Sequence, residues 1–201
     1  MDKEIEMTLE EMKLIQEHIS RIRESKKEEI NQNPIQDFCF HTHTQRCGHG
    51  AKDTGDEEWI EHAIKGGIKK LAFTDHIPLP DGMNHIANSR MDIAEVDSYL
   101  ASIHYFQEKY KGQIEIESGF EFEYSNRDLA HLQKLKSKTD KMVLGQHFVI
   151  DGNGKEYGIA RENGRKQISD EVLDLYAESI ISAMDKGLPD VIAHPDLFMQ
   201  A

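Results

Sequence analysis

The sequence has little cysteine, few basic residues for its number of acidic ones, and no long apolar run. Its two cysteines among 201 residues do not make a disulfide framework. No apolar stretch approaches the roughly 20 residues that a membrane-spanning helix needs. The 24 Lys and Arg residues stand against 37 Asp and Glu residues, and the formal net charge of −13 disfavours nucleic acid as a partner. The acidic N-terminal stretch does not resemble a secretory signal, so we expect a cytoplasmic protein with no membrane or nucleic-acid partner.

Residues 1–34 are predicted to form an amphipathic helical extension. Apolar residues recur there every three or four positions, which places them on one face of a helix. Thr8 followed by Glu11 matches the pattern of a capping box. We expect a helix over about 9–28 that packs on the following domain, with pairing to a second copy of the chain as the alternative.

Residues 35–201 are predicted to form one α/β domain, because short β-like runs alternate with helical stretches and this alternation favours a mainly parallel sheet. The strands are predicted over residues 38–43, 70–75, 114–121, 142–147 and 190–194. The helices are predicted after the capping boxes Thr54–Glu57 and Asp92–Glu95, and over about 128–138 and 170–186.

Each predicted strand ends in residues that bind metal ions or move protons. These residues are His41 and His43, Asp75 and His76, Glu121, His147, and His194. The carboxyl ends of parallel strands lie on one face of a fold, so these side chains are expected to converge. His41 and His43 are two positions apart and therefore leave the same face of a strand. Imidazole and carboxylate ligands suit Zn, Mn or Fe, so the pattern predicts a metal centre.

Several neighbouring residues leave the ligand set open. His49 lies in a loop whose glycines could bend a third imidazole toward the site. Glu123 shares a strand face with Glu121 and could be the ligand in its place. Cys47 could be a ligand or a small thiol beside the site, and the role of His85 is undecided.

Five motifs in this order resemble the polymerase and histidinol phosphatase (PHP) family. The motifs are HTHT at 41–44 with CGHG at 47–50, TDH at 74–76, GFE at 119–121, GQH at 145–147 and AHP at 193–195. The resemblance covers about residues 36–201. Within the family, the motifs are most similar to those of the histidinol-phosphate phosphatases. It implies a distorted (β/α)7 barrel of the TIM-like type, with a centre of up to three divalent metals, Zn, Mn or Fe, at its C-terminal face.

The resemblance also implies a role for each ligand. It implies His41 and His43 on one metal, Glu121 bridging to a second metal held by His147 and His194, and His49 and His76 on a third. Asp75 would orient an imidazole from behind, as carboxylates commonly do for metal-bound histidines.

The sequence departs from the family pattern after His194, where the family's last Asp-x-His motif is absent. Five strands are predicted where the family has seven. We therefore expect a partial barrel that is incomplete at its C-terminus and only partly loaded with metal. An open sheet edge, or the helix over 9–28, could then favour self-association.

The implied reaction is hydrolysis of L-histidinol phosphate to L-histidinol and phosphate in histidine biosynthesis. Clustered divalent ions neutralise a phosphate monoester and generate a hydroxide nucleophile near neutral pH. The residues expected to carry the reaction are His41, His43, Glu121, His147 and Asp75. Arg90 and Arg161 are candidate phosphate-binding residues, with a solvated surface position as the alternative. The other functions left open are hydrolysis of another small phosphorylated substrate and a non-catalytic metal-binding or interaction module.

Overall fold

The computed structural model of the chain describes Glu17, Ser20, Arg21 and residues 36–48, 50, 53–80, 89–159 and 168–200. The chain divides into two compact units, Met1–Gln36 and Asp37–Ala201. In the first unit, Glu17, Ser20 and Arg21 are helical, and the rest of the helix predicted over 9–28 lies outside the described residues. His49, His85 and Arg161 also lie outside them. None of the helices in the described part is long and apolar enough to cross a membrane.

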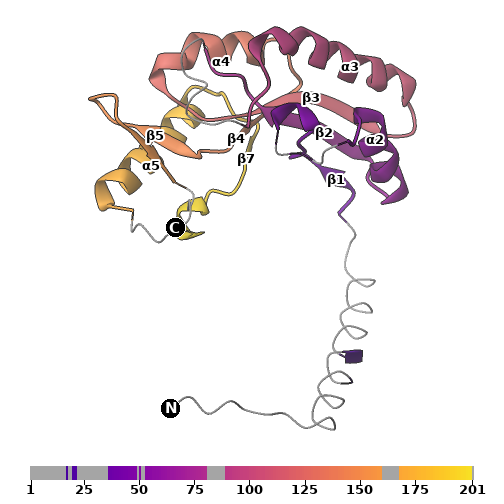
Figure 1. Cartoon of the computed structure of the whole chain (residues 1–201), viewed down its shortest axis with the longest axis horizontal. Coiled ribbons are helices and arrows are strands. Elements are labelled where there is room, and N and C mark those ends of the chain that lie inside the picture. Colours follow the sequence, from indigo (N-terminus) through magenta and orange to yellow (C-terminus); the bar gives the residue numbers. More distant parts are fainter. Residues whose placement is uncertain are drawn as a thin grey trace. The chain divides into compact units, whose positions relative to one another are not determined.

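The second unit is built on a curled sheet of five parallel strands (Figure 1). The strands are β1 (Phe38–Cys39), β2 (Lys70–His76), β3 (Glu115–Phe122), β4 (Lys141–Leu144) and β7 (Val191–Ile192). They stand in the order β1-β2-β3-β4-β7, and all four neighbouring pairs are parallel. The predicted α/β fold is therefore confirmed, in the form of a half-barrel whose strands all point their carboxyl ends to one side.

Four helices connect the strands, close to where the sequence predicts them. They are α2 (Asp56–Lys65), α3 (Val96–Lys109), α4 (Leu129–Lys136) and α5 (Asp170–Asp185). Short 3₁₀ turns η1 (Gln45–Cys47), η3 (Ile93–Glu95), η4 (Asn126–Asp128) and η5 (Leu197–Gln200) accompany them. In Figure 1, α3 and α4 lie together along one face of the sheet.

One predicted helix start is confirmed and one is wrong. The Glu95 carboxylate accepts from the Asp92 backbone N–H at 2.8 Å, as a capping box requires. The box predicted at Thr54 does not form, because α2 begins one residue later, with Gly55 as its N-cap. The Glu57 carboxylate accepts instead from the hydroxyl of Tyr110 at 2.7 Å. A contact between helices has therefore replaced the local cap.

Three predicted strands are shorter in the structure than the sequence suggested, and the one predicted over 190–194 is limited to β7. The strand predicted over 38–43 pairs only over β1, although Thr74 N–H still donates to the Thr42 carbonyl at 2.9 Å. The strand predicted over 142–147 ends at Leu144, and a hairpin of β5 (Phe148–Ile150) and β6 (Glu156–Gly158) follows it. No strand is predicted from the sequence over the residues of this hairpin. It packs on α5 around a small separate core that includes Val149.

The alternation of β3 separates the core from the polar face of the sheet. Ile116, Phe120 and Phe122 are buried in the main hydrophobic core, which also holds Tyr99 of α3. The Tyr99 hydroxyl lies 2.9 Å from a main-chain carbonyl oxygen of β2 and 2.9 Å from one of β3. Because successive strand residues point to opposite faces, Glu121 is directed away from this core.

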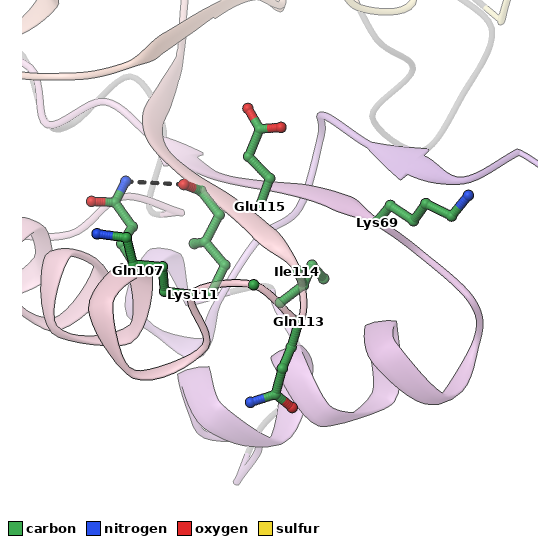
Figure 2. A pocket seen from close by; sticks show the side chains of 8 residues that line it. Lys69, Gln107, Lys111, Gln113, Ile114 and Glu115 are labelled. Atoms are coloured by element: carbon green, nitrogen blue, oxygen red, sulfur yellow. Dashed lines mark hydrogen bonds between the residues drawn. The ribbon is translucent and has the colours of Figure 1, made fainter.

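A shallow pocket lies at the amino-terminal ends of the strands, between the end of α3 and the start of β3 (Figure 2). Lys69, Lys111 and Glu115 are its charged lining residues, and Gln107 there donates to the Ile116 carbonyl at 3.0 Å. The pocket lacks a group of histidines and carboxylates, so it is not the converging site that the strand ends predict.

Asp140, just before β4, contacts β3 and α3 at this end of the sheet. Its replacement should lower the free energy of unfolding. Its carboxylate accepts from Ser118 N–H at 2.9 Å, Ser118 Oγ at 2.9 Å and Gln107 Nε2 at 2.8 Å. Burial raises the pKa of Asp140, but these hydrogen bonds lower it by a larger amount. The net pKa is therefore below the ordinary value. We expect Asp140→Ala to reduce the free energy of unfolding by about 1–2 kcal/mol at pH 7, measured by urea denaturation.

The sign of the pH effect follows from the lowered pKa. The stabilisation is present above the ordinary aspartate pKa of about 4 and disappears as the pH falls through the lower pKa of the folded state. The difference between Asp140→Ala and the wild type should therefore shrink below about pH 4. Asp174→Ala, at an exposed aspartate of α5, is the control and should change little. A difference that is the same at pH 7 and in acid would contradict the role given to Asp140.

Candidate metal centre

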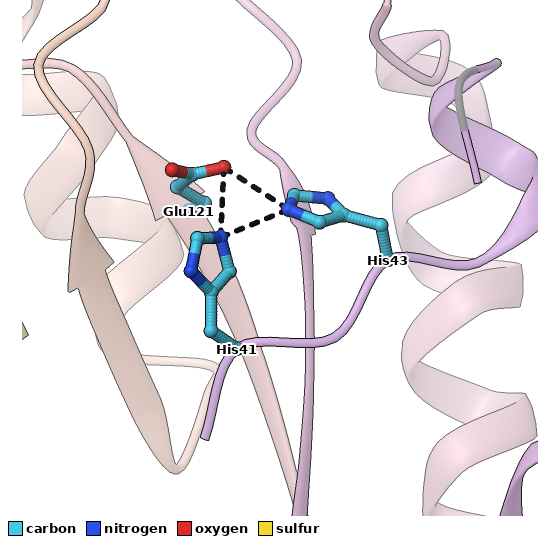
Figure 3. A group of neighbouring side chains, drawn as sticks. All are labelled: His41, His43 and Glu121. Carbon is cyan, nitrogen blue, oxygen red and sulfur yellow. Dashed lines mark hydrogen bonds and ion pairs between the residues drawn. The ribbon is translucent and has the colours of Figure 1, made fainter. Parts of the chain in front are cut away.

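At the carboxyl ends of the strands, one buried carboxylate is surrounded by five imidazoles. The Glu121 side chain is 1% exposed. Its Oε2 lies 3.3 Å from His41 Nε2, 3.2 Å from His43 Nε2 and 3.1 Å from His76 Nδ1. Its Oε1 lies 3.4 Å from His147 Nε2 and 2.9 Å from His194 Nε2. Figure 3 shows His41 and His43 pointing toward Glu121 from the segment after β1.

The five imidazoles form a closed ring around this carboxylate. The order around the ring is His41, His43, His76, His147, His194 and back to His41, with centroid distances from 4.7 Å to 5.6 Å. The structure thus brings together every predicted ligand among its described residues. The expected third-metal partner of His76, His49, lies outside them.

Hydrogen bonds between neighbouring strands place the first members of the ring. His76 is the last residue of β2 and stands opposite Glu121 in the strand register. The next residue, Ile77, donates its N–H to the Glu121 carbonyl at 2.7 Å. Between His41 and His43, Thr42 N–H donates to Thr74 Oγ1 at 3.1 Å. Both histidines are therefore held against the end of β2.

The last two histidines depend on backbone features of their strands. Gly145 follows β4, and a Cβ at this position would overlap Glu121 Oε1. His147 comes next after Gln146, whose buried amide accepts from Tyr124 N–H at 2.9 Å and donates to the Phe148 carbonyl at 2.7 Å. His194 has a φ of 33°, an unfavourable backbone conformation for a residue with a Cβ. Strain of this kind is typical of functional sites.

The structure separates the roles of the two glutamates that the sequence left as alternatives. Glu121 lies inside the ring of imidazoles, whereas Glu123 lies behind His147, with Oε1 2.8 Å from His147 Nδ1. The same Glu123 oxygen accepts from Arg90 Nη2 at 2.6 Å. Glu123 is therefore the carboxylate that contacts the second nitrogen of an imidazole.

Arg90 was predicted either to bind phosphate or to lie solvated on the surface, and its contacts fit neither description. Its side chain is 3% exposed, so it is not a solvated surface arginine. Nη1 donates to the Ile77 carbonyl at 2.9 Å while Nη2 binds Glu123, so both terminal nitrogens already have partners. The prediction that Arg90 clamps a phosphate is not supported by this arrangement, because a clamp needs these donors turned toward the substrate.

The role predicted for Asp75, orienting an imidazole, stays a prediction, and its hydrogen bonds go to the turn beside His43. Its carboxylate accepts from Thr44 N–H at 2.6 Å and from Thr44 Oγ1 at 2.7 Å, so it anchors the turn after His43. Burial raises the pKa of Asp75, and the Thr44 hydrogen bonds oppose this rise. Cys47 lies in the same turn, with Sγ 3.5 Å from His43 Nδ1. The turn thus holds His43 from the side away from Glu121.

The electrostatics favour an ionised Glu121 beside an uncharged His76. Burial by itself raises the pKa of Glu121, but the imidazoles of His194, His41 and His43 lower it more, and the net pKa lies well below the ordinary value. Burial lowers the pKa of His76 to about 3. At neutral pH the site therefore offers a carboxylate and the lone pair of an uncharged imidazole, which are the forms that bind a metal.

These donors fit a divalent cation. Among the described residues, Glu121 Oε2 is buried without a well-formed hydrogen bond. His41 Nε2 and His43 Nε2 lie only 2.9 Å from each other and both face that oxygen. Three overlapping groups could each hold an ion. They are His41 with His43 and Glu121, His76 with Glu121 and His147, and His43 with Cys47 and Asp75. Imidazole and carboxylate are the ligand types that suit Zn, Mn or Fe.

Comparison with known proteins gives a consistent result for family and fold. The family described as the PHP domain matches residues 40–201. The chain is 34% identical to the histidinol-phosphatase of Bacillus subtilis over 116 residues, which are 54% of this chain and 43% of the relative. It is 28% identical over 160 residues to a probable histidinol-phosphatase of Deinococcus radiodurans, covering 78% of this chain and 59% of the relative. The chain thus spans about half the length of the curated relatives it matches.

Two solved structures share the fold. A Listeria monocytogenes protein described as a candidate histidinol phosphatase matches with a TM-score of 0.67 at 22% identity, over 80% of this chain and 67% of that one. A histidinol phosphate phosphatase of Lactococcus lactis, solved with zinc, L-histidinol and phosphate, matches with a TM-score of 0.57 at 17% identity. That match covers 81% of this chain and 59% of the other.

The contact between Gly145 and Glu121 can be tested by adding one methyl group. We expect Gly145→Ala to push the Glu121 carboxylate out of the ring and to weaken binding of Zn or Mn by at least about tenfold. Isothermal titration calorimetry with each metal measures the affinity, and far-UV circular dichroism reports whether the fold is retained. Gly152→Ala is the matched control, because a Cβ there would meet no atom within 4 Å. Equal metal affinity in the two variants would show that Glu121 does not hold the metal.

Proposed function

This chain belongs to the PHP domain family, and from that membership we propose that it is a metal-dependent phosphomonoesterase acting on L-histidinol phosphate. The observation that carries the proposal is the ring of five imidazoles around the Glu121 carboxylate. A site of this composition suits hydrolysis of a phosphate monoester, because the dianionic substrate needs positive charge before a nucleophile can approach. The products would be L-histidinol and inorganic phosphate.

The residues of the site would hold two or more divalent ions in fixed positions. His41 and His43 would hold one ion together with Glu121 Oε2, and His147 and His194 would hold another with Glu121 Oε1. When bound, such ions supply Lewis acidity toward phosphoryl oxygens and lower the pKa of a coordinated water. The chain supplies the geometry for this chemistry, because each ligand is fixed by the end of a strand or by a hydrogen bond to its neighbour.

The exposure of the imidazoles indicates where a substrate would enter. His41, His147 and His194 are the more exposed members of the ring, at 32%, 29% and 26% of their side chains. His76 lies deeper and is 11% exposed. Among the described residues, the approach is therefore from the side of His41, His147 and His194. A phosphoryl group entering there would approach the histidines around Glu121 Oε1 and those around Glu121 Oε2 at the same time.

The choice of L-histidinol phosphate rests on the relatives. Both curated relatives bear histidinol-phosphatase names, and the Lactococcus lactis structure holds zinc, L-histidinol and phosphate. The net charge of −13 also suits a small substrate drawn to a cationic centre better than a polyanion. Arg90 is engaged with Glu123 and Ile77, so recognition of the substrate falls to other residues. Arg161 keeps its proposed role in binding phosphate.

Phosphate release from L-histidinol phosphate tests the proposal directly. We expect release by the 201-residue chain with added Mn or Zn, and a decrease of at least about 100-fold in a His41→Ala, His43→Ala variant. A colorimetric phosphate assay measures both. The matched control is a His62→Ala, His104→Ala variant, which removes two exposed histidines of α2 and α3 and should retain the rate.

A substrate panel separates the two levels of the proposal. A nucleotide, a sugar phosphate and phosphotyrosine, assayed in parallel, should be hydrolysed more slowly than L-histidinol phosphate. If another member of the panel is preferred, the reaction class is retained and the substrate is wrong. If no compound is hydrolysed faster than by the His41→Ala, His43→Ala variant, the phosphatase assignment itself fails.

A further inference from the structure

A chain of buried polar contacts continues outward from the ring of imidazoles. Behind His147, Glu123 Oε1 lies 2.8 Å from Nδ1, and Arg90 Nη2 lies 2.6 Å from the same oxygen. The side chains of Glu123 and Arg90 are 1% and 3% exposed. Arg90 also donates from Nη1 to the carbonyl of Ile77, at 2.9 Å. One guanidinium thus connects the segment after β2 with a carboxylate just beyond β3.

We propose that Arg90 and Glu123 are positioning residues for His147, and that this buried ion pair fixes which nitrogen of the imidazole faces the Glu121 centre. The inference rests on the proposed function only for the presence of a metal. It assigns to Arg90 a task different from binding substrate. Arg90, which follows β2 in the chain, would help to orient His147, which follows β4.

The two nitrogens of His147 face two different carboxylates. Nδ1 faces the Glu123 carboxylate, and Nε2 faces Glu121 at 3.4 Å. A carboxylate is an acceptor only, so a neutral His147 must carry its proton on Nδ1 to make the contact with Glu123. Nε2 then has a free lone pair directed into the ring. The position of Glu123 therefore selects the tautomer that can bind a metal.

Glu123 needs an anchor of its own to perform this task. A buried carboxylate that contacted only an imidazole could turn its oxygens in several directions. The Arg90 guanidinium restricts this freedom, because its planar donors bind Glu123 and the Ile77 carbonyl in one fixed geometry. A buried ion pair contributes little net stability by itself, so a positioning role explains its presence better than stabilisation of the fold does.

The anchor also joins two parts of the centre. Ile77 directly follows His76, and its N–H donates to the Glu121 carbonyl. By holding the Ile77 carbonyl, Arg90 fixes the backbone next to His76 at the same time as it fixes Glu123. A single side chain thereby relates the positions of His76 and His147, whose ring centroids are 5.0 Å apart.

Replacing Arg90 with methionine distinguishes positioning from simple electrostatics. Removing a positive charge near a cation site should by itself strengthen metal binding, because like charges repel. Loss of positioning should weaken it instead. We expect Arg90→Met to lower the affinity for Zn or Mn about 10-fold to 100-fold, measured by calorimetry on the full chain. Arg90→Lys should recover part of the affinity, because an ammonium can reach Glu123 without reproducing both contacts.

Nitrogen-15 NMR of histidine-labelled protein gives a readout that needs neither substrate nor turnover. In the metal-free wild type, at a pH high enough to keep His147 neutral, the His147 signals should show a proton on Nδ1 and none on Nε2. In Arg90→Met and in Glu123→Met, this pattern should give way to a mixture of tautomers. The His147 signals are identified by their absence in His147→Gln.

Lys136→Met is the matched control. Lys136 also connects a carbonyl and a carboxylate, with Nζ 2.7 Å from the Leu188 oxygen and 3.6 Å from an oxygen of Asp190, but it lies at the other end of the sheet. It should leave both metal affinity and the His147 tautomer unchanged. Circular dichroism and thermal unfolding of each variant identify a general loss of structure.

The possible outcomes separate this inference from the proposed function. Weaker metal binding with a changed His147 tautomer in folded Arg90→Met supports the positioning role, even if L-histidinol phosphate is not hydrolysed. Unchanged or tighter metal binding, or an unchanged tautomer, overturns it. If Arg90→Met does not fold, the comparison of Arg90→Lys and Glu123→Met with the wild type decides by the same two measurements.

Discussion

A carboxylate buried at the end of the central strand is the constraint on which this structure depends. Glu121 belongs to β3, which has β2 on one side and β4 on the other, and its side chain is 1% exposed. A buried ionised group is costly unless it is surrounded by polar partners or by metal. Here the imidazole partners come from the ends of the other four strands, β1, β2, β4 and β7, so satisfying one charge requires the whole sheet to close around it.

A second layer of polar groups extends from the same requirement. Glu123 and Arg90 lie behind His147, while Asp75 binds the turn that follows His43. Burial raises the pKa of Glu123, but Arg90 and His147 lower it more, so the net pKa is below its ordinary value. Each buried carboxylate is thus matched to a particular donor. Glu121 and Glu123 share the polar face of the sheet, whereas the opposite face carries the apolar core.

The sequence predicted the strands, the helices and the converging residues because these depend on local patterns. The alternation of β3 and the two-residue spacing of His41 and His43 can be read within a few positions. The hairpin of β5 and β6 was missed although it has a local signal, the glycine-rich turn Asp151–Lys155, in which Gly154 has a φ of 87°. It directly follows the strand predicted over 142–147, and no further strand is predicted between that strand and the helix over 170–186.

The roles of Arg90 and Asp75 could not be predicted from local pattern, because their partners are distant in sequence. Arg90 binds a carboxylate 33 residues away, and Asp75 binds a threonine 31 residues away. A single sequence shows that such residues are polar and near a strand end, but not which of them face each other. The choice between Glu121 and Glu123 was open for the same reason, since both lie on one face of a strand.

The long separation between Glu121 and His194 has a consequence for the order in which the protein acquires its structure. These two contacting residues are 73 positions apart, and His194 follows β7, which joins the sheet only through β4. Contacts of such range form late, because a long loop must close before they can be made. During synthesis, a nascent chain would therefore expose four of the five imidazoles before the fifth had left the ribosome. Capture of the ion assigned to His147 and His194 would then coincide with completion of the sheet.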